Sequence, residues 1–430
     1  MKVETSGLSF PFEMGFFASS SIIFAGSFVV NLLNYIFTLL MSRLLSVEDF
    51  GEVAALLSLF IIISVPATAL AMLMARESAH YKEQGDSGVR YLFIRMRAYS
   101  AAGAVGLWAL FIFLVPFVSD YLRIPTLPIY IFSAVAPLAI LGALQSGTLQ
   151  GLQKFFSVAK QGILSALVKL GGSVLLVWAG FSVAGVMGAL VLASLASFIY
   201  GFFATRSHLR GVAPESGQAF NISGLATYFG GILLTTLLLA LLSNVDVILA
   251  KHYLSADLAG QYGALSTVGK ILIYGVGAFI SVLLPLAAAA HARGEGAERD
   301  VLWLSLMSVA VVSFGAFIVF SLFPHLVVSL LFGARYVDIA AYLGTFTIAM
   351  ACIALSSVFI NYFVATRNTS FVYLLGVGIA AEIGLIALYH DSLVSIVHSL
   401  VYASVALLAL MVGNYFVAYR GRVLKDDYAA

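Results

Sequence analysis

The sequence predicts an all-α polytopic membrane protein with about twelve transmembrane helices, arranged as two pseudo-symmetric six-helix lobes around a central cavity. Three observations support this fold class. Of the 430 residues, 62% are hydrophobic and only 10% are charged, whereas a soluble domain carries roughly 25% charged residues. The mean hydropathy is +1.04. Apolar runs of membrane-spanning length follow one another along the chain, and a polar motif between them occurs twice.

Each predicted span is a stretch of about 20 predominantly apolar residues. The expected spans are 17–41, 53–75, 98–119, 128–149, 158–180 and 183–204 in the first half, and 224–250, 262–289, 303–323, 339–364, 371–389 and 393–418 in the second half. No segment alternates with strand-like periodicity between barrel-type turns, so a β-barrel is disfavoured.

The repeated motif lies between the first and second spans of each half. Leu45-Ser46-Val47-Glu48-Asp49-Phe50-Gly51 returns as Leu254-Ser255-Ala256-Asp257-Leu258-Ala259-Gly260, an offset of 209 residues. Serine and then an acidic residue favour a helix start, and glycine permits a close turn. Recurrence at half the chain length indicates a duplicated unit. We therefore expect an N-terminal lobe at 1–210 and a C-terminal lobe at 211–430.

Lysine and arginine are distributed unequally between the segments that join the spans. Sixteen lie on the side of the amino terminus, and four (Arg43, Arg123, Lys251 and Arg335) lie on the opposite side. The positive-inside rule therefore predicts a multi-pass protein of the plasma or inner membrane with both termini in the cytoplasm. A net charge of +2 does not suggest a nucleic-acid partner, and the single Cys352 excludes cysteine-based metal sites.

Few ionisable residues fall inside the predicted spans, and such residues usually face a cavity or a partner. Lys169 lies near the middle of the fifth span and Glu382 near the middle of the eleventh, which are equivalent helices of the two halves. Facing each other across a cavity, they would bind and gate an anion. The alternatives are a structural ion pair, or a lysine that reaches the membrane interface.

A second polar group ends the seventh span. Asn244 and Asp246 carry oxygens suited to Na⁺, and a buried carboxylate can also carry a proton. We therefore predict Asp246, Asn244 and Glu382 as ion-coupling residues, with Na⁺ or H⁺ as the coupling ion and no other cofactor or resident metal. Lys270 either contributes to substrate binding or pairs with Asp246.

Further candidates come from amides and arginines near span ends. Asn34 and Gln145 could hydrogen-bond a sugar in a hydrated interior, although amides in spans commonly join helices to one another. Arg43 and Arg367 suit phosphate through their fork of donors, with headgroup anchoring as the alternative. No set of residues pairs a nucleophile with a base, so we expect no catalytic residues and no enzyme activity.

The motifs also resemble a known family. Ser42–Gly51 resembles the helix-one exit of the polysaccharide transport branch of the multidrug/oligosaccharidyl-lipid/polysaccharide exporter superfamily. Leu149–Phe155 after the fourth span, and Ser243–Asp246 leading to Gly260–Tyr262, resemble further family segments. Of the candidate residues, only Arg43 and Asp246 lie in matched motifs.

The resemblance implies a flippase that moves polyprenyl-(pyro)phosphate-linked oligosaccharides to the outer leaflet by alternating access, coupled to an ion gradient. Glycosyltransferases and a polymerase of the same pathway would be its partners. A cation-coupled multidrug exporter is the nearest alternative, but the predicted spans of the first half hold Lys169 and no carboxylate. A lipid II flippase would have additional helices. A glycan polymerase or ligase would need a large outer loop, and no such loop is predicted.

Overall fold

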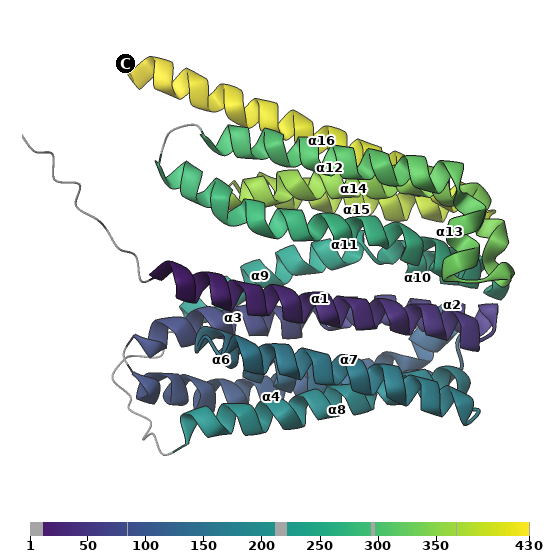
Figure 1. The fold of residues 1–430 in the computed structure, drawn as a ribbon, viewed down its shortest axis with the longest axis horizontal. Helices are drawn as coiled ribbons and strands as arrows, with labels where there is room; N and C mark the ends of the chain where they lie inside the picture. Colours follow the sequence, from purple (N-terminus) through teal and green to yellow (C-terminus); the bar gives the residue numbers. More distant parts are fainter. Residues whose placement is uncertain (1–11, 84, 211–221, 294–296, 367, 430) are drawn as a thin grey trace, which may run out of the picture. The chain divides into compact units, whose positions relative to one another are not determined.

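The computed structural model describes residues 12–83, 85–210, 222–293, 297–366 and 368–429 (Figure 1). Nearly all of them are helical, and none of them lies in a β-strand. The helices are α1 (Phe12–Leu44), α2 (Val47–Ile63), α3 (Val65–Lys82), α4 (Asp86–Leu122), α5 (Thr126–Ser133), α6 (Val135–Gly151), α7 (Phe155–Trp178), α8 (Ser182–Leu209), α9 (Ile222–Leu242), α10 (Val245–Tyr253), α11 (Ala256–Arg293), α12 (Ala297–Leu322), α13 (Pro324–Leu331), the 3₁₀-helix η1 (Ala334–Ile339), α14 (Ala340–Ala365), α15 (Ser370–Leu388) and α16 (Leu393–Ala429).

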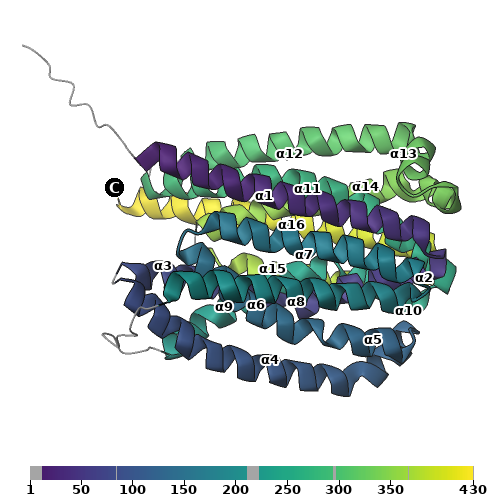
Figure 2. The same cartoon turned by 60° about the horizontal axis from the view of Figure 1, so that its bottom comes forward.

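The predicted fold class is confirmed. Among the described residues, eleven helical stretches are long and apolar enough to cross a membrane. They coincide with eleven of the predicted spans, and α11 covers the remaining one at 262–289. The protein is therefore a multi-pass membrane protein. Helices α7 and α8, which pack against each other, lie side by side in both views (Figures 1 and 2).

Three predicted spans are each divided into two successive helices. The second span breaks at Ser64 and the fourth at Ala134, each two or three residues before a proline. Proline has no N–H to donate and crowds the preceding turn, which explains both breaks. The seventh span breaks at Ser243 and Asn244 without a proline. This last break places Asp246 in the first turn of α10, where a carboxylate suits the helix dipole.

The repeated motif starts a helix in both copies, as predicted. The Ser46 hydroxyl accepts a hydrogen bond from the Asp49 backbone N–H at 3.0 Å at the start of α2. The Ser255 hydroxyl accepts one from the Leu258 N–H at 3.4 Å at the start of α11. Helix α2 begins at Val47, six residues before the predicted span, so Glu52 lies inside the helix and pairs with Lys251 at 4.0 Å.

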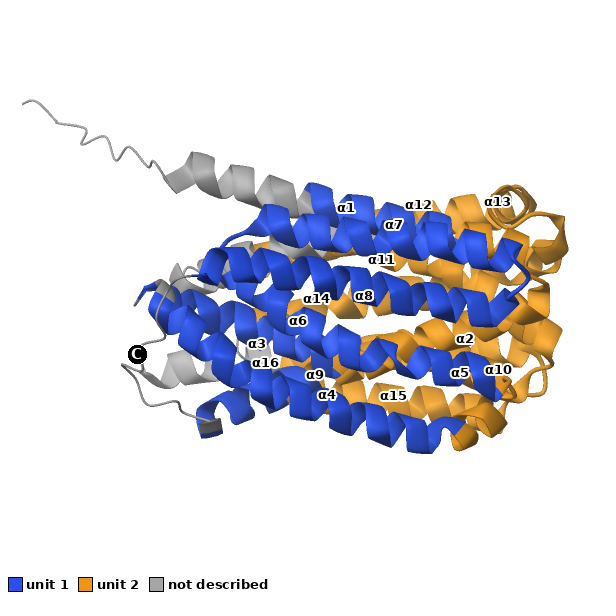
Figure 3. Ribbon diagram, turned by 90° about the horizontal axis from the view of Figure 1, so that it is seen from below, with its two compact units in different colours: residues 1–38, 66–115, 126–233 blue, residues 39–65, 116–125, 234–430 orange. Residues whose placement is uncertain are grey.

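The chain forms two compact units, which interleave along the sequence (Figure 3). Unit 1 consists of residues 1–38, 66–115 and 126–233, and unit 2 of residues 39–65, 116–125 and 234–430. The units group segments that contact one another, whereas the expected lobes group the two repeats. The boundary between 1–210 and 211–430 therefore stays a prediction.

Unit 1 is built around α8, which packs against α5, α6 and α7. A second layer of packing brings α3 and α4 against α6 through buried side chains such as Leu70, Met74, Leu92 and Leu144. Leu225 and Phe229 of α9 pack against the same cluster. In the lipid core this packing rests on close contact between side chains, because lipid chains are as apolar as the side chains themselves.

In unit 2, α11 packs against α2, α12 and α14, and α16 packs against α14 and α15. The two copies of the repeated motif meet where α2 crosses α11. A Cβ added to Gly51 would lie 2.7 Å from the Gly260 nitrogen, and one added to Gly260 would overlap the Val47 carbonyl oxygen. Only glycine allows this approach of two backbones. The motif glycines thus hold the two repeats together.

Candidate functional site

Lys169 is the central charged group of unit 1. It lies on α7, and its ammonium donates a hydrogen bond to the Asn34 side-chain oxygen of α1 at 2.6 Å. The same ammonium lies 4.3 Å from the centre of the Phe37 ring, a cation–π contact from the next turn of α1. The structure therefore brings together two predicted substrate-binding residues that are 135 residues apart in the sequence.

Among the described residues, no carboxylate pairs with Lys169, whose contacts are Asn34 and Phe37. Phe37 is 1% exposed and forms an apolar floor beneath the cation. An amide oxygen and an aromatic ring stabilise an ammonium without cancelling its charge. Lys169 is thus prepared to attract an anion, and its environment does not match the alternative of a structural ion pair.

Unit 2 holds a different group, centred on Asp246 at the start of α10. Asp246 is 2% exposed, and the Tyr262 hydroxyl of α11 donates a hydrogen bond to its Oδ2 at 3.0 Å. Two turns further along α11, the Lys270 ammonium donates to the Asn244 side-chain oxygen at 3.4 Å. Asn244 in turn donates to the Ala240 carbonyl at 2.9 Å, which closes the break between α9 and α10.

Glu382 of α15 completes this group, which we call the acidic cluster (Asn244, Asp246, Tyr262, Lys270 and Glu382). Glu382 is 1% exposed, and its charge interacts with those of Asp246 and Lys270. Asp246 Oδ1 and Glu382 Oε1 are both buried without a hydrogen-bond partner. Two carboxylates therefore face one ammonium, an imbalance that a proton or a monovalent cation would relieve.

The two sites occupy related positions in the two repeats. The two motifs are 209 residues apart, so Phe37 in the first repeat and Asp246 in the second hold equivalent positions. The first repeat thus has an aromatic ring, beside a lysine, where the second has a carboxylate. The two repeats therefore place different residue types at this register position, and Lys169 likewise corresponds to Gly378 and Glu382 to Ser173.

The other predicted site residues are held by helix contacts. Gln145 is 3% exposed and lies against Gly201 of α8, next to Gln161. The Arg43 guanidinium donates to the Leu330 carbonyl at 2.6 Å, and it lies about 13 Å along α1 from Asn34. Lys270 belongs to the acidic cluster through its hydrogen bond to Asn244, and its predicted pairing with Asp246 stays a prediction. Arg367 lies outside the described residues.

Glu382 has its charged partners within unit 2, in the acidic cluster, and Lys169 has its contacts within unit 1. Their predicted gating pair therefore stays a hypothesis.

Two residues that contribute to the sites were not predicted from the sequence. In the sequence alone, nothing distinguishes Phe37 or Tyr262 from the many aromatic residues that only pack in the interior. The spacing of eight residues between Tyr262 and Lys270, two turns on one helix face, is a signal that points to Tyr262.

Three comparisons relate the chain to known proteins. A family model described as "Polysaccharide biosynthesis protein" matches residues 40–341. No curated protein sequence matches the chain. Among solved structures, an inward-facing multidrug resistance MATE family transporter of the MOP superfamily has a TM-score of 0.73 at 12% identity, covering 91% of this chain and 96% of the other.

Two further structures share the fold. The lipid II flippase MurJ, in an inward closed conformation, has a TM-score of 0.69 at 13% identity and covers 91% of this chain and 87% of its own. A MOP superfamily transporter from Pyrococcus furiosus Vc1 has a TM-score of 0.64 at 12% identity, with 92% and 94% covered. At such identities these likenesses define the fold, which is that of the MOP superfamily.

Proposed function

Because the chain belongs to the polysaccharide biosynthesis protein family, we propose that it is a flippase for polyprenyl-(pyro)phosphate-linked oligosaccharides. It moves them from the cytoplasmic to the outer leaflet by alternating access, for the synthesis of a cell-surface polysaccharide. Its partners are then the glycosyltransferases that build the glycan and the polymerase that consumes it. The known flippase of lipid II has the same fold, which supports cargo of this type.

The observation that carries the proposal is the environment of Lys169. A partly buried ammonium that contacts an amide and an aromatic ring, with no described carboxylate paired to it, selects an anion. The pyrophosphate of a lipid-linked sugar provides such an anion, and it must cross the membrane interior together with the glycan. Asn34, predicted to hydrogen-bond a sugar, also holds the Lys169 ammonium in position.

The acidic cluster of unit 2 supplies the coupling step in this proposal. Binding of H⁺ or Na⁺ between Asp246 and Glu382 would neutralise their excess negative charge and satisfy their unpaired oxygens. Release of the ion on the other side of the membrane restores the repulsion between the carboxylates. The two states thus differ in charge at a buried site, which is what an ion gradient needs to bias a conformational equilibrium.

The proposed location is the plasma or inner membrane, with both termini in the cytoplasm. The support is the excess of lysine and arginine in segments on the side of the amino terminus. Fusions of a reporter at residues 85 and 257 test this orientation, with a cytoplasmic signal expected at 85 and an external one at 257. An external signal at 85 would contradict the orientation.

Export of the surface glycan in cells tests the role of Lys169. Lys169→Ala should lower export at least about tenfold, the cost of losing one charge-assisted contact, and Lys169→Arg should keep part of it because the charge remains. Lys160→Ala is the matched control, since Lys160 lies on the same helix over the Phe156 ring at 4.5 Å and is exposed. Unchanged export in Lys169→Ala cells contradicts the proposal.

The competing function is a cation exporter like the multidrug transporter of the same fold. Such a protein needs a carboxylate where its cationic substrate binds, and the position in unit 1 holds Lys169. Resistance to lipophilic cations in cells that overproduce the protein would favour this alternative, whereas accumulation of a lipid-linked oligosaccharide in cells lacking it favours the flippase.

A further inference from the structure

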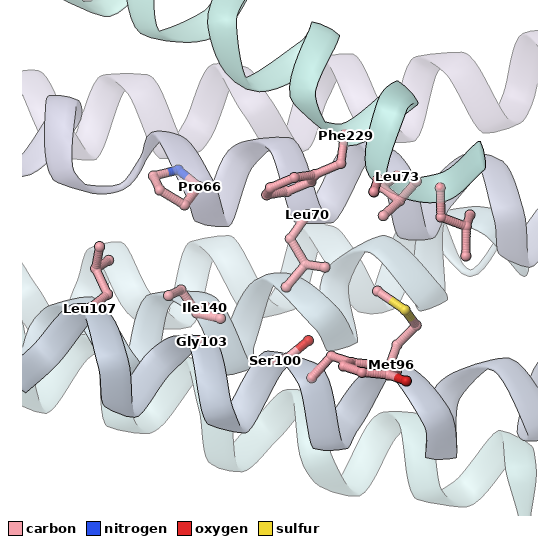
Figure 4. Close-up of a pocket in the computed structure, with 12 residues that line it drawn as sticks. Pro66, Leu70, Leu73, Met96, Ser100, Gly103, Leu107, Ile140 and Phe229 are labelled. Carbon is pink, nitrogen blue, oxygen red and sulfur yellow. The ribbon is translucent and has the colours of Figure 1, made fainter. Parts of the chain in front are cut away.

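Unit 1 contains a cavity of about 360 Å³ that the proposed transport step does not use. It lies between α3, α4, α6 and α9, and Figure 4 shows Leu70 and Phe229 entering it from α3 and α9. Its walls are almost entirely apolar, and the volume falls within the range of about 300–1,000 Å³ typical of ligand sites. We call this cavity the α4 slot.

The α4 slot is long and follows the helix axes. On α4 its wall runs from Met96 through Gly103 to Leu107, one stripe along the helix that is about 16 Å long at 1.5 Å per residue. This length is about half of the ~30 Å hydrocarbon core, the depth of a single leaflet. An elongated apolar cavity of this depth fits a lipid chain better than a compact ligand.

The middle of the slot, beside Gly103, has room for further atoms. A Cβ added to Gly103 would meet no atom within 4 Å, so the space beside this residue is open. Helix α9, which forms the opposite wall, buries only 6% of its spanning residues. Hydrocarbon in the slot would therefore cover apolar surface that α9 leaves exposed.

Basic residues lie close in sequence to residues that line the slot. Arg76 follows Leu73 by one turn on α3, and its guanidinium lies 4.1 Å from the centre of the Tyr228 ring, next to Phe229. Its contact with Glu77, at 3.9 Å, is the long-range limit of an ion pair. Arg95 and Arg97, both exposed, flank Met96 on α4. Arg76, whose guanidinium lies against α9 beside the slot, therefore suits a phosphate group there.

We propose that the α4 slot is a binding site for the isoprenoid chain of a polyprenyl phosphate, whose phosphate is held by Arg76. The identity of the lipid rests on the proposed function, because that function requires a polyprenyl carrier in the same membrane. The site is separate from Lys169, which lies on α7 and does not line the slot. It holds the carrier lipid against the protein before or after transport of the glycan.

Binding of a long-chain polyprenyl monophosphate to the purified full-length protein tests this site, measured by native mass spectrometry with phosphatidylglycerol as competitor. Gly103→Phe should weaken binding about tenfold, because its side chain takes the volume that the chain occupies. Gly106→Phe is the matched control: it lies on the same helix, a Cβ there also meets nothing within 4 Å, and it does not line the slot.

Ala226→Phe enters the slot from α9 and should give the same loss, which covers the case in which the Gly103 variant does not fold. Arg76→Gln should weaken binding of the phosphate and leave binding of the uncharged polyprenol unchanged. Wild-type affinity in both slot variants, an equal loss in Gly106→Phe, or equal competition by phosphatidylglycerol would each overturn the proposal.

Failure of this inference and failure of the proposed function give different results. If only the slot is wrong, Gly103→Phe binds the lipid normally while export still depends on Lys169. If only the proposed function is wrong, Lys169→Ala leaves export unchanged while the slot variants still lose the polyprenyl phosphate.

Discussion

The two repeats place opposite chemistry at one register position. In unit 1, Phe37 lies beneath the Lys169 ammonium, and Asn34 accepts its hydrogen bond. In unit 2, the residue in register with Phe37 is Asp246, buried beside Glu382 and Lys270. The first site has an unneutralised positive charge, and the second has one carboxylate too many for its single ammonium.

In the proposed function, this difference assigns cargo binding to one half and ion coupling to the other. A gene duplication supplies two copies of one helical scaffold, and a few substitutions at buried positions then decide which charge each copy can accommodate. Because buried charges without partners are costly, each site selects the ion that neutralises it. Unit 1 thereby suits an anionic cargo, and unit 2 suits a proton or a cation that drives it.

The largest effect is expected at the crossing of the repeats. Gly260→Val would drive a side chain into the Val47 carbonyl and should destabilise the protein by about 3 kcal/mol or more, the upper range for overpacking. Thermal unfolding in detergent measures this loss. Gly275→Val is the control on the same helix, where an added Cβ meets nothing within 4 Å. Equal unfolding temperatures for the two variants would contradict the described crossing.

Replacing Phe37 by the residue at the equivalent position of the second repeat tests whether the two sites differ in the charge that they accept. Phe37→Asp gives the first repeat the residue of the second and places a carboxylate beside Lys169. It should lower glycan export by about ten- to a hundredfold, because the ammonium is then neutralised before the substrate arrives. Phe37→Asn introduces a side chain of nearly the same size as aspartate but without its charge, so this variant should retain more export than Phe37→Asp. If the two variants export equally, the charge of Lys169 does not select the cargo.

The acidic cluster should show a smaller and different effect. Asp246→Asn and Glu382→Gln remove one charge each and should lower gradient-driven transport about tenfold, in the range of typical coupling energies. The remaining transport should no longer respond to pH or Na⁺. Asp391→Asn changes an exposed carboxylate near the end of α15 and should keep the wild-type response. A wild-type dependence on both ions in Asp246→Asn would assign the cluster a structural role only.

Much of the fold follows from the sequence because lipid imposes simple rules. Spans must be long, apolar and helical, so their number and approximate positions can be predicted. The break at Ser243 and Asn244 was not predicted, because no proline or glycine marks it. At this break the Asn244 side chain, in place of a backbone N–H, donates to the Ala240 carbonyl. The helix start at the Ser46 motif was predicted, but the predicted span began only at residue 53, and the pairing of Glu52 with Lys251 was not foreseen.

The candidate sites were predictable only in part. Lys169, Asp246 and Glu382 stand out singly, because a charge in an apolar span is conspicuous. Their partners do not stand out: Asn34 approaches Lys169 from 135 residues away, and Tyr262 reaches Asp246 from the next helix. Tertiary packing determines such pairs, and a single sequence does not contain that information. Arg43 matched a family motif, yet its guanidinium contacts the Leu330 carbonyl.

Reconstituted transport tests the central claim most directly. Proteoliposomes that contain the purified protein should move a fluorescent polyprenyl-pyrophosphate-linked oligosaccharide between leaflets when an ion gradient is applied. We expect flipping by the wild type, loss of flipping with Lys169→Ala, and no transport of a lipophilic cation. Flipping by Lys169→Ala at the wild-type rate, or transport of the cation in place of the lipid-linked glycan, would contradict this claim.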